Sequence, residues 1–301
     1  MSRTASPLVL QHLTKSYGNS RGIEDVSFSL RPGEVFGFLG PNGAGKTTAI
    51  RTITGFMQPT SGSFRLLGAS DSEAQRKARA RVGYLAGDIA LYGRLTGRQL
   101  LKYLAKLGRD ADWQYVAELE RRFEAELDKP IRSLSKGNRQ KLGVIQAFMH
   151  RPKLAILDEP TSGLDPLMKQ VFYEIVRESS ADKRTIFVSS HDLSEVQKIC
   201  DRAGFIRNGK LISVETIAEV MEYSTHQYIV EFAKKPAKTM FDKVDSVQEV
   251  HIDGRTMTVT VRGEVGEFVR ELAKHKPVGL REHELELEEL FMHHYTDKEQ
   301  S

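Results

Sequence analysis

Apolar residues in the first 215 positions come mostly in short unbroken runs rather than in strict alternation. The clearest runs are residues 34–39, 154–157 and 185–189, and each is followed by polar residues and then by a segment rich in helix formers. Unbroken apolar runs interleaved with helices are typical of a parallel sheet covered on both faces. The pattern therefore predicts an α/β fold for this part of the chain.

Further elements are predicted around these runs. Two strands are expected near the start of the chain, at residues 8–13 and 26–30, with a polar, glycine-containing turn between them. A helix is expected from Thr47 to about residue 56, where a Pro-Thr-Ser-Gly segment follows. Residues 91–150 are predicted to be mostly helical, because leucines recur there at helical spacing.

The pattern changes near residue 222, where apolar and polar residues begin to alternate. Strands are predicted at residues 227–232, 247–252, 257–262 and 278–281, and helices at 238–243, 264–275 and 285–295. The order βαββαβ with an extra helix is typical of a small ferredoxin-like α/β domain. We therefore expect two domains, residues 1–221 and residues 222–301.

Composition and charge narrow the class of protein without naming a function. Hydrophobic residues make up 40% and charged residues 28% of the chain, as in ordinary globular proteins. The net charge of +4 is small, and the densest basic stretch, residues 76–81, is expected to be a solvated helix face, with an acidic partner or lipid headgroups as the alternative. Nothing in this balance requires nucleic acid.

Cysteine content and hydropathy bear on the compartment. Cys200 is the single cysteine, so the chain forms no internal disulfide, which suits a reducing compartment. The first seven residues are polar and lack the apolar core of a signal peptide. Because no window approaches the ~20 apolar residues of a membrane-spanning helix, a role at a membrane would need a second chain that crosses it.

A glycine-rich loop follows the predicted strand 34–39 and precedes the first predicted helix. Its sequence, Gly40-Pro41-Asn42-Gly43-Ala44-Gly45-Lys46-Thr47-Thr48, fits the phosphate-loop pattern G-x-x-x-x-G-K-[ST] in the required strand–loop–helix context. Glycines allow backbone N–H groups to turn toward phosphates, and the helix adds its positive end. Lys46 would contact the β- and γ-phosphates, and the Thr47 hydroxyl would ligate Mg²⁺. The loop predicts a nucleotide site.

Polar side chains with catalytic chemistry follow two later strands. The apolar run 154–157 ends in Asp158 and Glu159, and two carboxylates at a buried strand end are costly unless positive charge lies nearby. Asp158 would hold Mg²⁺, and Glu159 would act on the water that attacks the γ-phosphate. His191 follows the run 185–189, and we expect it at the same sheet edge, where ligands of open α/β sheets bind.

A third loop decides which kind of phosphate-loop protein this is. Leu134-Ser135-Lys136-Gly137-Asn138-Arg139-Gln140 resembles the signature sequence of ABC-transporter ATPases, and Ser135 is a plausible cap for the helix that follows. The resemblance implies that Ser135, Lys136, Gly137 and Asn138 bind the nucleotide of a partner subunit. In that family two subunits pack head to tail and enclose two ATP molecules.

The resemblance to this family covers residues 8–215 and carries over to further positions. It implies that Tyr17 stacks on adenine, that Ser162-Gly163-Leu164-Asp165 is the loop that crosses the dimer interface, that His191 senses the γ-phosphate and that Glu159 is the catalytic base. It also implies a P-loop ABC ATPase fold with an antiparallel β subdomain and a helical subdomain at about residues 88–150.

Three positions depart from the family pattern. Gly87 stands where the family places a glutamine that contacts Mg²⁺ and water, so either Asp88 substitutes for it or the metal relies on Thr47 and Asp158. Lys136 replaces a glycine of the signature and Asn138 replaces its glutamine.

The expected function is therefore ATP hydrolysis, with ATP and Mg²⁺ as cofactors, in a subunit that drives export through a separate membrane permease. The partners expected are that permease and a second ABC ATPase, identical or different, with no nucleic acid. The expected location is cytoplasmic, on the inner face of the cell membrane. Alternatives are a non-transport ABC ATPase acting on nucleic acid or ribosomes, and a P-loop kinase, against which the signature loop and Glu159 argue. The C-terminal domain could be regulatory, stabilise a dimer or dock the permease.

Overall fold

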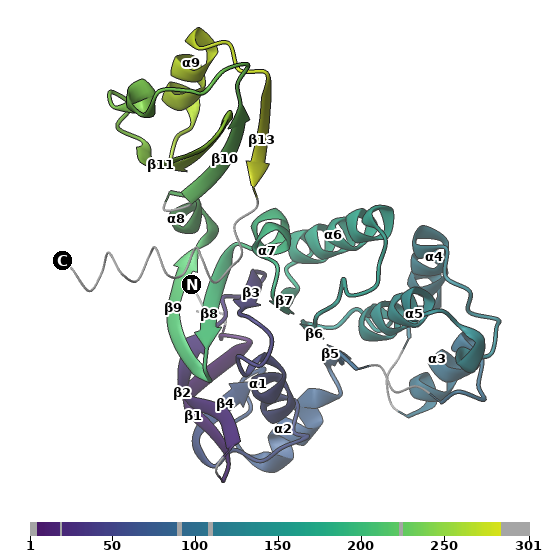
Figure 1. Cartoon of the computed structure of the whole chain (residues 1–301). Coiled ribbons are helices and arrows are strands. Elements are labelled where there is room, and N and C mark those ends of the chain that lie inside the picture. The colour runs from purple at the N-terminus through teal and green to yellow at the C-terminus, as the bar shows by residue number, and fades with distance from the viewer. Residues whose placement is uncertain (1–4, 19, 89–91, 108–110, 223–224, 284–301) are drawn as a thin grey trace. The chain divides into compact units, whose positions relative to one another are not determined.

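The chain folds into two compact units. The computed structural model describes residues 5–18, 20–88, 92–107, 111–222 and 225–283 (Figure 1). The units are Met1–Glu215 and Thr216–Ser301. Their boundary lies one short helix, α8 (Ile217–Glu222), before the boundary predicted from the sequence. The helix predicted at residues 285–295 lies outside the described residues.

A nine-stranded sheet forms the centre of the first unit, in the order β4-β1-β2-β9-β8-β3-β7-β6-β5. In chain order its strands are β1 (Leu8–Tyr17), β2 (Ser20–Ser29), β3 (Val35–Leu39), β4 (Ser61–Leu66), β5 (Val82–Leu85), β6 (Leu154–Asp158), β7 (Thr185–Ser190), β8 (Arg202–Arg207) and β9 (Lys210–Thr216).

The half of this sheet that contains the predicted apolar runs is parallel. β3 pairs with β7 and β8, and β6 pairs with β5 and β7, all in parallel. Every residue of β3, β6 and β7 is buried, which explains their unbroken apolar sequences. Four phenylalanines stack in this core with ring centroids 5.1–6.0 Å apart, namely Phe28, Phe36, Phe38 and Phe187. The predicted α/β class is confirmed.

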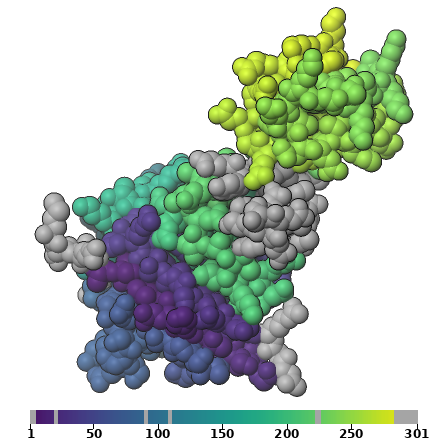
Figure 2. Space-filling model, turned by 90° about the vertical axis from the view of Figure 1, so that its left-hand side faces the viewer, coloured from purple at the N-terminus to yellow at the C-terminus, as the bar shows by residue number. Residues whose placement is uncertain are grey.

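The other half of the sheet is mixed, because β2 pairs with β9 in parallel while the β1 pairs are antiparallel, and its first strands are longer than the sequence indicated. β1 pairs with β2 and with β4. It extends to Tyr17, beyond the predicted end at residue 13, because its polar second half pairs with β2 through Lys15 opposite Ile23 and Tyr17 opposite Ser20. Figure 2 shows the purple surface of these N-terminal strands beside green surface near residue 210, in agreement with the pairing of β2 and β9.

Helices cover the sheet and form a separate cluster beyond β5 and β6. In chain order they are α1 (Lys46–Ile53), α2 (Ser72–Arg79), α3 (Gly97–Lys106), α4 (Trp113–Phe123), the 3₁₀ turn η1 (Ile131–Ser133), α5 (Lys136–Phe148), α6 (Pro166–Ala181) and α7 (Leu193–Ile199). Figure 1 shows α3, α4 and α5 gathered together on one side of the unit. α1 ends before the predicted residue 56 because Gly55 adopts a φ of +83°, in the left-handed region that ends helices.

The second unit is a four-stranded antiparallel sheet in the order β11-β12-β10-β13. Its elements after α8 are β10 (Thr225–Glu231), the 3₁₀ turn η2 (Lys238–Phe241), β11 (Val247–Asp253), β12 (Thr256–Arg262), α9 (Gly266–Lys274) and β13 (Gly279–His283). This is the strand order of the ferredoxin-like arrangement. The helix predicted at 238–243 is a single 3₁₀ turn, and its buried Phe241 packs against Phe268 of α9 with the two rings tilted relative to each other.

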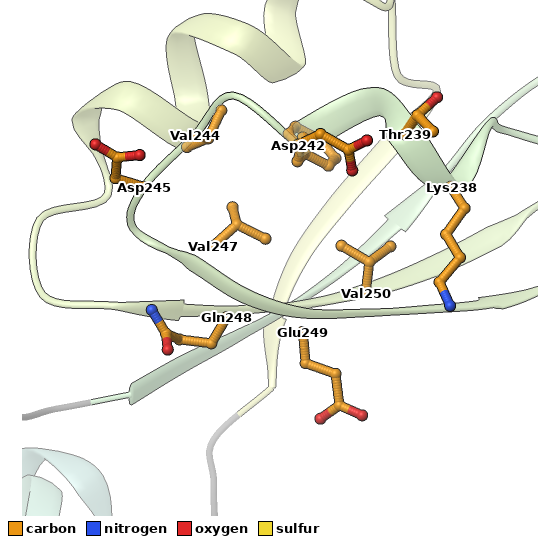
Figure 3. Close-up of a pocket in the computed structure, with 10 residues that line it drawn as sticks. Lys238, Thr239, Asp242, Val244, Asp245, Val247, Gln248, Glu249 and Val250 are labelled. Carbon is orange, nitrogen blue, oxygen red and sulfur yellow. The ribbon is translucent and has the colours of Figure 1, made fainter.

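A groove of about 620 Å³ lies between η2 and β11 in this unit. The pairing of β11 with β12 shifts register between Val247 and Glu249, which marks a β-bulge at Gln248. The bulge lets Val247 and Val250 point into the groove together, whereas Gln248 and Glu249 point away from it (Figure 3). The carboxylates of Asp242, Asp245 and Glu249 face different directions, so they do not form a convergent polar site.

The phenylalanine stack predicts a large effect of truncation at Phe187. Phe187→Ala should lower the free energy of unfolding of the first unit by about 3–5 kcal/mol, because it removes a fully buried ring and leaves a cavity. Urea unfolding followed by tyrosine fluorescence and circular dichroism measures this. Leu167→Ala is the control: its side chain is exposed on α6, and we expect a change below about 0.5 kcal/mol. Equal effects of the two substitutions would contradict this view of the core.

Candidate nucleotide site

Three neighbouring parallel strands end at one edge of the first unit's sheet. β7 lies between β3 and β6, and all three run in the same direction. The glycine-rich loop follows β3, Asp158 and Glu159 lie at the end of β6, and His191 directly follows β7. Because the carboxyl ends of parallel strands share one edge, these residues meet although they are far apart in sequence.

The backbone of the loop 40–48 requires glycine at defined positions. Gly43 and Gly45 have φ angles of +81° and +109°, in the left-handed region that disfavours other residues. A Cβ atom on Gly40 would lie 2.2 Å from the carbonyl oxygen of Ile206 on β8, which excludes any side chain there. Gly45 also precedes α1 without a side chain to cap it, so the first N–H groups of this helix are available to an anion. Pro41, Asn42, Ala44 and Thr48 complete the loop.

Lys46 is buried, and its side chain bonds to the backbone of the phosphate loop. Its Nζ donates hydrogen bonds to the carbonyl oxygens of Gly40 at 2.5 Å and Pro41 at 3.2 Å. The same Nζ lies 3.3 Å from Oε1 of Glu159, so the cation of the phosphate loop is paired with the second carboxylate of β6. A buried charge is tolerated only with such partners.

Asp158 is almost fully buried and is held by two hydroxyl groups. Its Oδ2 accepts a hydrogen bond from Thr47 Oγ1 at 2.9 Å, and its Oδ1 accepts one from Ser189 Oγ at 2.5 Å. A hydroxyl and a carboxylate oxygen side by side fit a Mg²⁺ ion that takes its remaining ligands from phosphates and water. Within the described residues no group of three His, Cys, Asp or Glu side chains is placed to hold a metal by itself.

Glu159 lies between the phosphate loop and His191 in an unusual backbone conformation. Its φ of +48° is in the left-handed region, and its backbone is fixed there by two side chains: its N–H donates to Ser189 Oγ at 3.0 Å, and its carbonyl accepts from Gln140 Nε2 at 3.2 Å. Its Oε2 lies 2.8 Å from Nδ1 of His191. Its Oε1, beside Lys46, is buried and accepts no hydrogen bond from the described residues. An oriented carboxylate of this kind can accept a proton from water.

Two of the side chains that build this geometry were given no role at the carboxylates in the sequence prediction, although Gln140 stands in the signature sequence. Ser189 bridges Asp158 and Glu159, and its position at the polar end of an apolar strand was the available signal. Gln140 of α5 donates to the carbonyl oxygens of both Glu159 and Pro160. Its signal was weaker, because a glutamine in a helix is ordinarily exposed.

The loop after β5 reaches the same carboxylate from the other side. A Cβ atom on Gly87 would lie 3.2 Å from Asp158 Oδ2, so the position that lacks the family's glutamine adjoins Asp158. Asp88 is exposed, and no hydrogen bond between described residues joins it to Thr47 or Asp158. On β5 itself, burial and the nearby charge of Asp158 raise the pKa of Tyr84, although Arg51 opposes the shift.

The signature loop is not brought to the phosphate loop of its own chain. Ser135 caps α5 by accepting a hydrogen bond from the N–H of Asn138 at 3.2 Å, and both Ser135 and Lys136 are exposed. The Asn138 amide donates to Glu126 at 3.2 Å, and the Lys136 side chain lies beside Gly163. No hydrogen bond or ion pair between described residues joins 135–138 to 40–48. Gly137 also adjoins Gly163, where a Cβ atom would lie 2.9 Å from its carbonyl oxygen.

Two further predicted residues lie at the margins of the site. Tyr17 ends β1, half exposed, with its hydroxyl 2.7 Å from Met57 Sδ and with Lys15 Nζ 5.6 Å from the centroid of its ring. Asp165 caps α6 by accepting a hydrogen bond from Met168 N–H at 3.0 Å, and this fixes the end of the loop 162–165.

Comparison with known proteins supports a single family. The ABC transporter family model matches residues 23–162. The uncharacterized ABC transporter ATP-binding protein YhcH of Bacillus subtilis is 33% identical over 249 residues, which cover 81% of each chain. The linearmycin resistance ATP-binding protein LnrL of Bacillus subtilis is 35% identical over 219 residues, which cover 69% of each chain.

A solved structure of an ATP-binding subunit of an ABC transporter has the same fold. It matches with a TM-score of 0.67 and 30% identity, and the match covers 71% of this chain and 92% of that one. Fold, sequence and the geometry at the ends of β3, β6 and β7 agree. The chain therefore belongs to the ABC transporter ATP-binding proteins and is an ATPase.

Proposed function

We propose that this chain drives export through a separate membrane permease, as one of two ATPase subunits that close on ATP and Mg²⁺. The observation that carries the proposal is the contact series Lys46–Glu159–His191 beside Thr47–Asp158, at one edge of the sheet. It combines a phosphate-binding cation, a carboxylate suited to activate water, and a pair of oxygen ligands suited to Mg²⁺.

In this proposal the residues of the site exchange partners when ATP binds. The backbone of the loop 40–48 would bind the phosphates, and Lys46 would move from Glu159 to the β- and γ-phosphates. Glu159 would then be free to accept a proton from the attacking water, while His191 keeps its carboxylate oriented and contacts the γ-phosphate. Mg²⁺ held by Thr47 and Asp158 would neutralise phosphate charge, with Asp88 as a further candidate ligand. Tyr17 would stack on the adenine.

The second ATPase subunit is inferred from the signature loop. The N-terminus of α5 is a second helix end suited to an anion, and its exposed Ser135 and Lys136 are not directed at the chain's own phosphate loop. A partner's nucleotide is the ligand that fits it, and Lys136, Gly137 and Asn138 would lie near that γ-phosphate. The loop ending at Asp165 would then contact the same partner.

The permease and the direction of transport are inferred from the chain's character and from its relatives. None of the described helices is long and apolar enough to cross a membrane. A relative named for linearmycin resistance favours export, because resistance follows when a compound is removed from the cell. We assign the contact with the permease to the helical region at roughly residues 88–135. We place the chain on the cytoplasmic face of the membrane and assign the second unit an accessory role.

Glu159→Gln tests the hydrolytic role. It should lower ATP turnover by about 10²- to 10⁴-fold, because an amide cannot accept the proton of the attacking water. ATP affinity should persist, and the variant should form an ATP-dependent dimer detectable by size-exclusion chromatography with light scattering. Steady-state phosphate release and nucleotide binding measure the two effects. Glu174→Gln, an exposed carboxylate on α6 that pairs with Arg122, is the matched control and should retain turnover.

Lys46→Ala separates loss of binding from loss of chemistry. Removal of the buried cation should abolish measurable ATP binding and therefore dimer formation, unlike Glu159→Gln. Wild-type turnover in Glu159→Gln would exclude Glu159 as the base, and wild-type ATP affinity in Lys46→Ala would exclude the phosphate-loop assignment.

Gly87→Gln tests the loop after β5 as a neighbour of the metal. Because a Cβ atom at this position lies 3.2 Å from Asp158 Oδ2, the new amide should reach the proposed Mg²⁺ site and shift the Mg²⁺ concentration for half-maximal turnover several-fold. Mn²⁺ binding with ATP, followed by electron paramagnetic resonance, gives a readout independent of turnover. An unchanged metal dependence in both assays would place the loop outside the site. Asp88→Asn tests the neighbouring carboxylate, which is a ligand only if its loss weakens metal binding.

A further inference from the structure

The side chain of Glu195 lies outside the group of residues proposed to bind ATP, and it contacts three segments that support that group. Glu195 lies in the first turn of α7 and is 7% exposed. Its Oε2 accepts hydrogen bonds from Thr161 Oγ1 at 2.7 Å and from Ser190 Oγ at 3.3 Å. Its Oε1 pairs with Lys169 Nζ at 2.7 Å. The side chain therefore has three partners on three different segments.

Each partner belongs to a segment with a role in the proposed site. Thr161 is the second residue after Glu159 and begins the loop that ends at Asp165. Ser190 directly precedes His191, whose ring contacts Glu159. Lys169 lies in the first turns of α6, and its N–H donates to the carbonyl oxygen of Asp165 at 2.9 Å. Glu195 thus ties both ends of the loop 161–165 to the residue beside His191.

The charge of Glu195 suits this arrangement better than a neutral group of the same shape. A buried carboxylate is stable when a cation and hydrogen-bond donors surround it, and Lys169 and two hydroxyl groups supply both here. A glutamine would have a single acceptor oxygen for these three donors, and its NH₂ group would face either the lysine or the hydroxyl groups. A glutamine with its oxygen toward Lys169 would instead donate from its NH₂ group to the hydroxyl groups, so the charge-assisted hydrogen bonds would be lost and the contact with Thr161 would reverse its direction.

We propose that Glu195 is a positioning residue that couples the loop 161–165 to the Glu159–His191 pair. A partner subunit that presses on this loop would thereby fix the orientation of His191 and Glu159 for attack on the γ-phosphate. This inference rests on the proposed function, in which the loop contacts a partner and Glu159 activates water. The side chain of Glu195 bonds to Thr161, Ser190 and Lys169, and no hydrogen bond or ion pair between described residues joins it to the loop 40–48 or to Asp158, so its effect is on geometry.

Glu195→Gln and Thr161→Val test the coupling in the full-length chain. Each should lower kcat for ATP hydrolysis by about 10- to 100-fold, because small displacements of reacting groups have effects of that size. The apparent KM for ATP and the binding of ATP should change by less than about threefold, since the phosphate loop is untouched. Thr161→Val keeps the shape of the side chain and leaves Glu195 with Lys169 and Ser190, so it should fold even if Glu195→Gln does not.

Two controls distinguish positioning from a structural effect. Thr161→Ser restores the hydroxyl group and should return kcat to within about threefold of the wild-type value. Glu178→Gln removes another carboxylate of the α6 region, which pairs with Arg122 and not with the site, and should leave kcat unchanged. A role confined to stability would lower the melting temperature in Thr161→Val without lowering kcat per ATP-binding site.

A double-mutant cycle tests whether Thr161 acts through the Glu159–His191 pair. His191→Ala combined with Thr161→Val should be scarcely slower than His191→Ala alone, because both changes act through the same pair. Independent, multiplicative losses would overturn the inference, as would an unchanged kcat in Thr161→Val. Failure of the proposed function would be seen differently, since the wild-type chain would then lack ATP hydrolysis or Glu159→Gln would retain it.

Discussion

The burial of two adjacent carboxylates at the end of β6 is the constraint on which the rest of the site depends. Asp158 is almost fully buried and Glu159 is partly buried, so each must be compensated by cations or hydrogen-bond donors. Asp158 takes hydroxyl groups from Thr47 and Ser189, and Glu159 takes Lys46 and His191. The partners come from the ends of β3 and β7 because these strands flank the same edge. Compensation of the carboxylates therefore brings the phosphate loop, Thr47 and His191 together in one place.

The same constraint explains the backbone around Glu159. A left-handed φ at a residue with a long side chain is strained, and it persists only where the surroundings determine it. Ser189 holds the N–H of Glu159, and Gln140 holds its carbonyl. Glu159 is thus held by Ser189 of the neighbouring strand β7 and by Gln140 of α5. Because Gln140 lies on α5, a displacement of α5 would shift the backbone of Glu159. The signature loop, which leads into α5, is therefore connected through this helix to Glu159 of its own chain.

The position of Gly87 gives a structural meaning to the departure from the family pattern. The residue adjoins Asp158 closely enough that a side chain would enter the space beside the carboxylate. Gly87 has no side chain to occupy that space, so in the proposed site the metal would rely more on Thr47 and Asp158. The carboxylates around the groove of the second unit point in different directions and do not converge in this way (Figure 3).

The sequence by itself determined the elements whose chemistry is local. The strand–loop–helix order around Gly40–Thr48, the buried run that ends in Asp158-Glu159 and the strands of the tail follow from patterns within a few residues, whereas the first predicted helix of the tail is a 3₁₀ turn. Tertiary structure alone decided that Ser189 bridges the two carboxylates, that Gln140 clamps Glu159, that Gly87 adjoins Asp158 and that Glu195 joins Thr161 to Ser190 and Lys169. These contacts depend on the strand order β3-β7-β6-β5 and on the packing of α5 and α7. The order of strands is set by long-range pairing and core packing, which local propensity and periodicity do not encode.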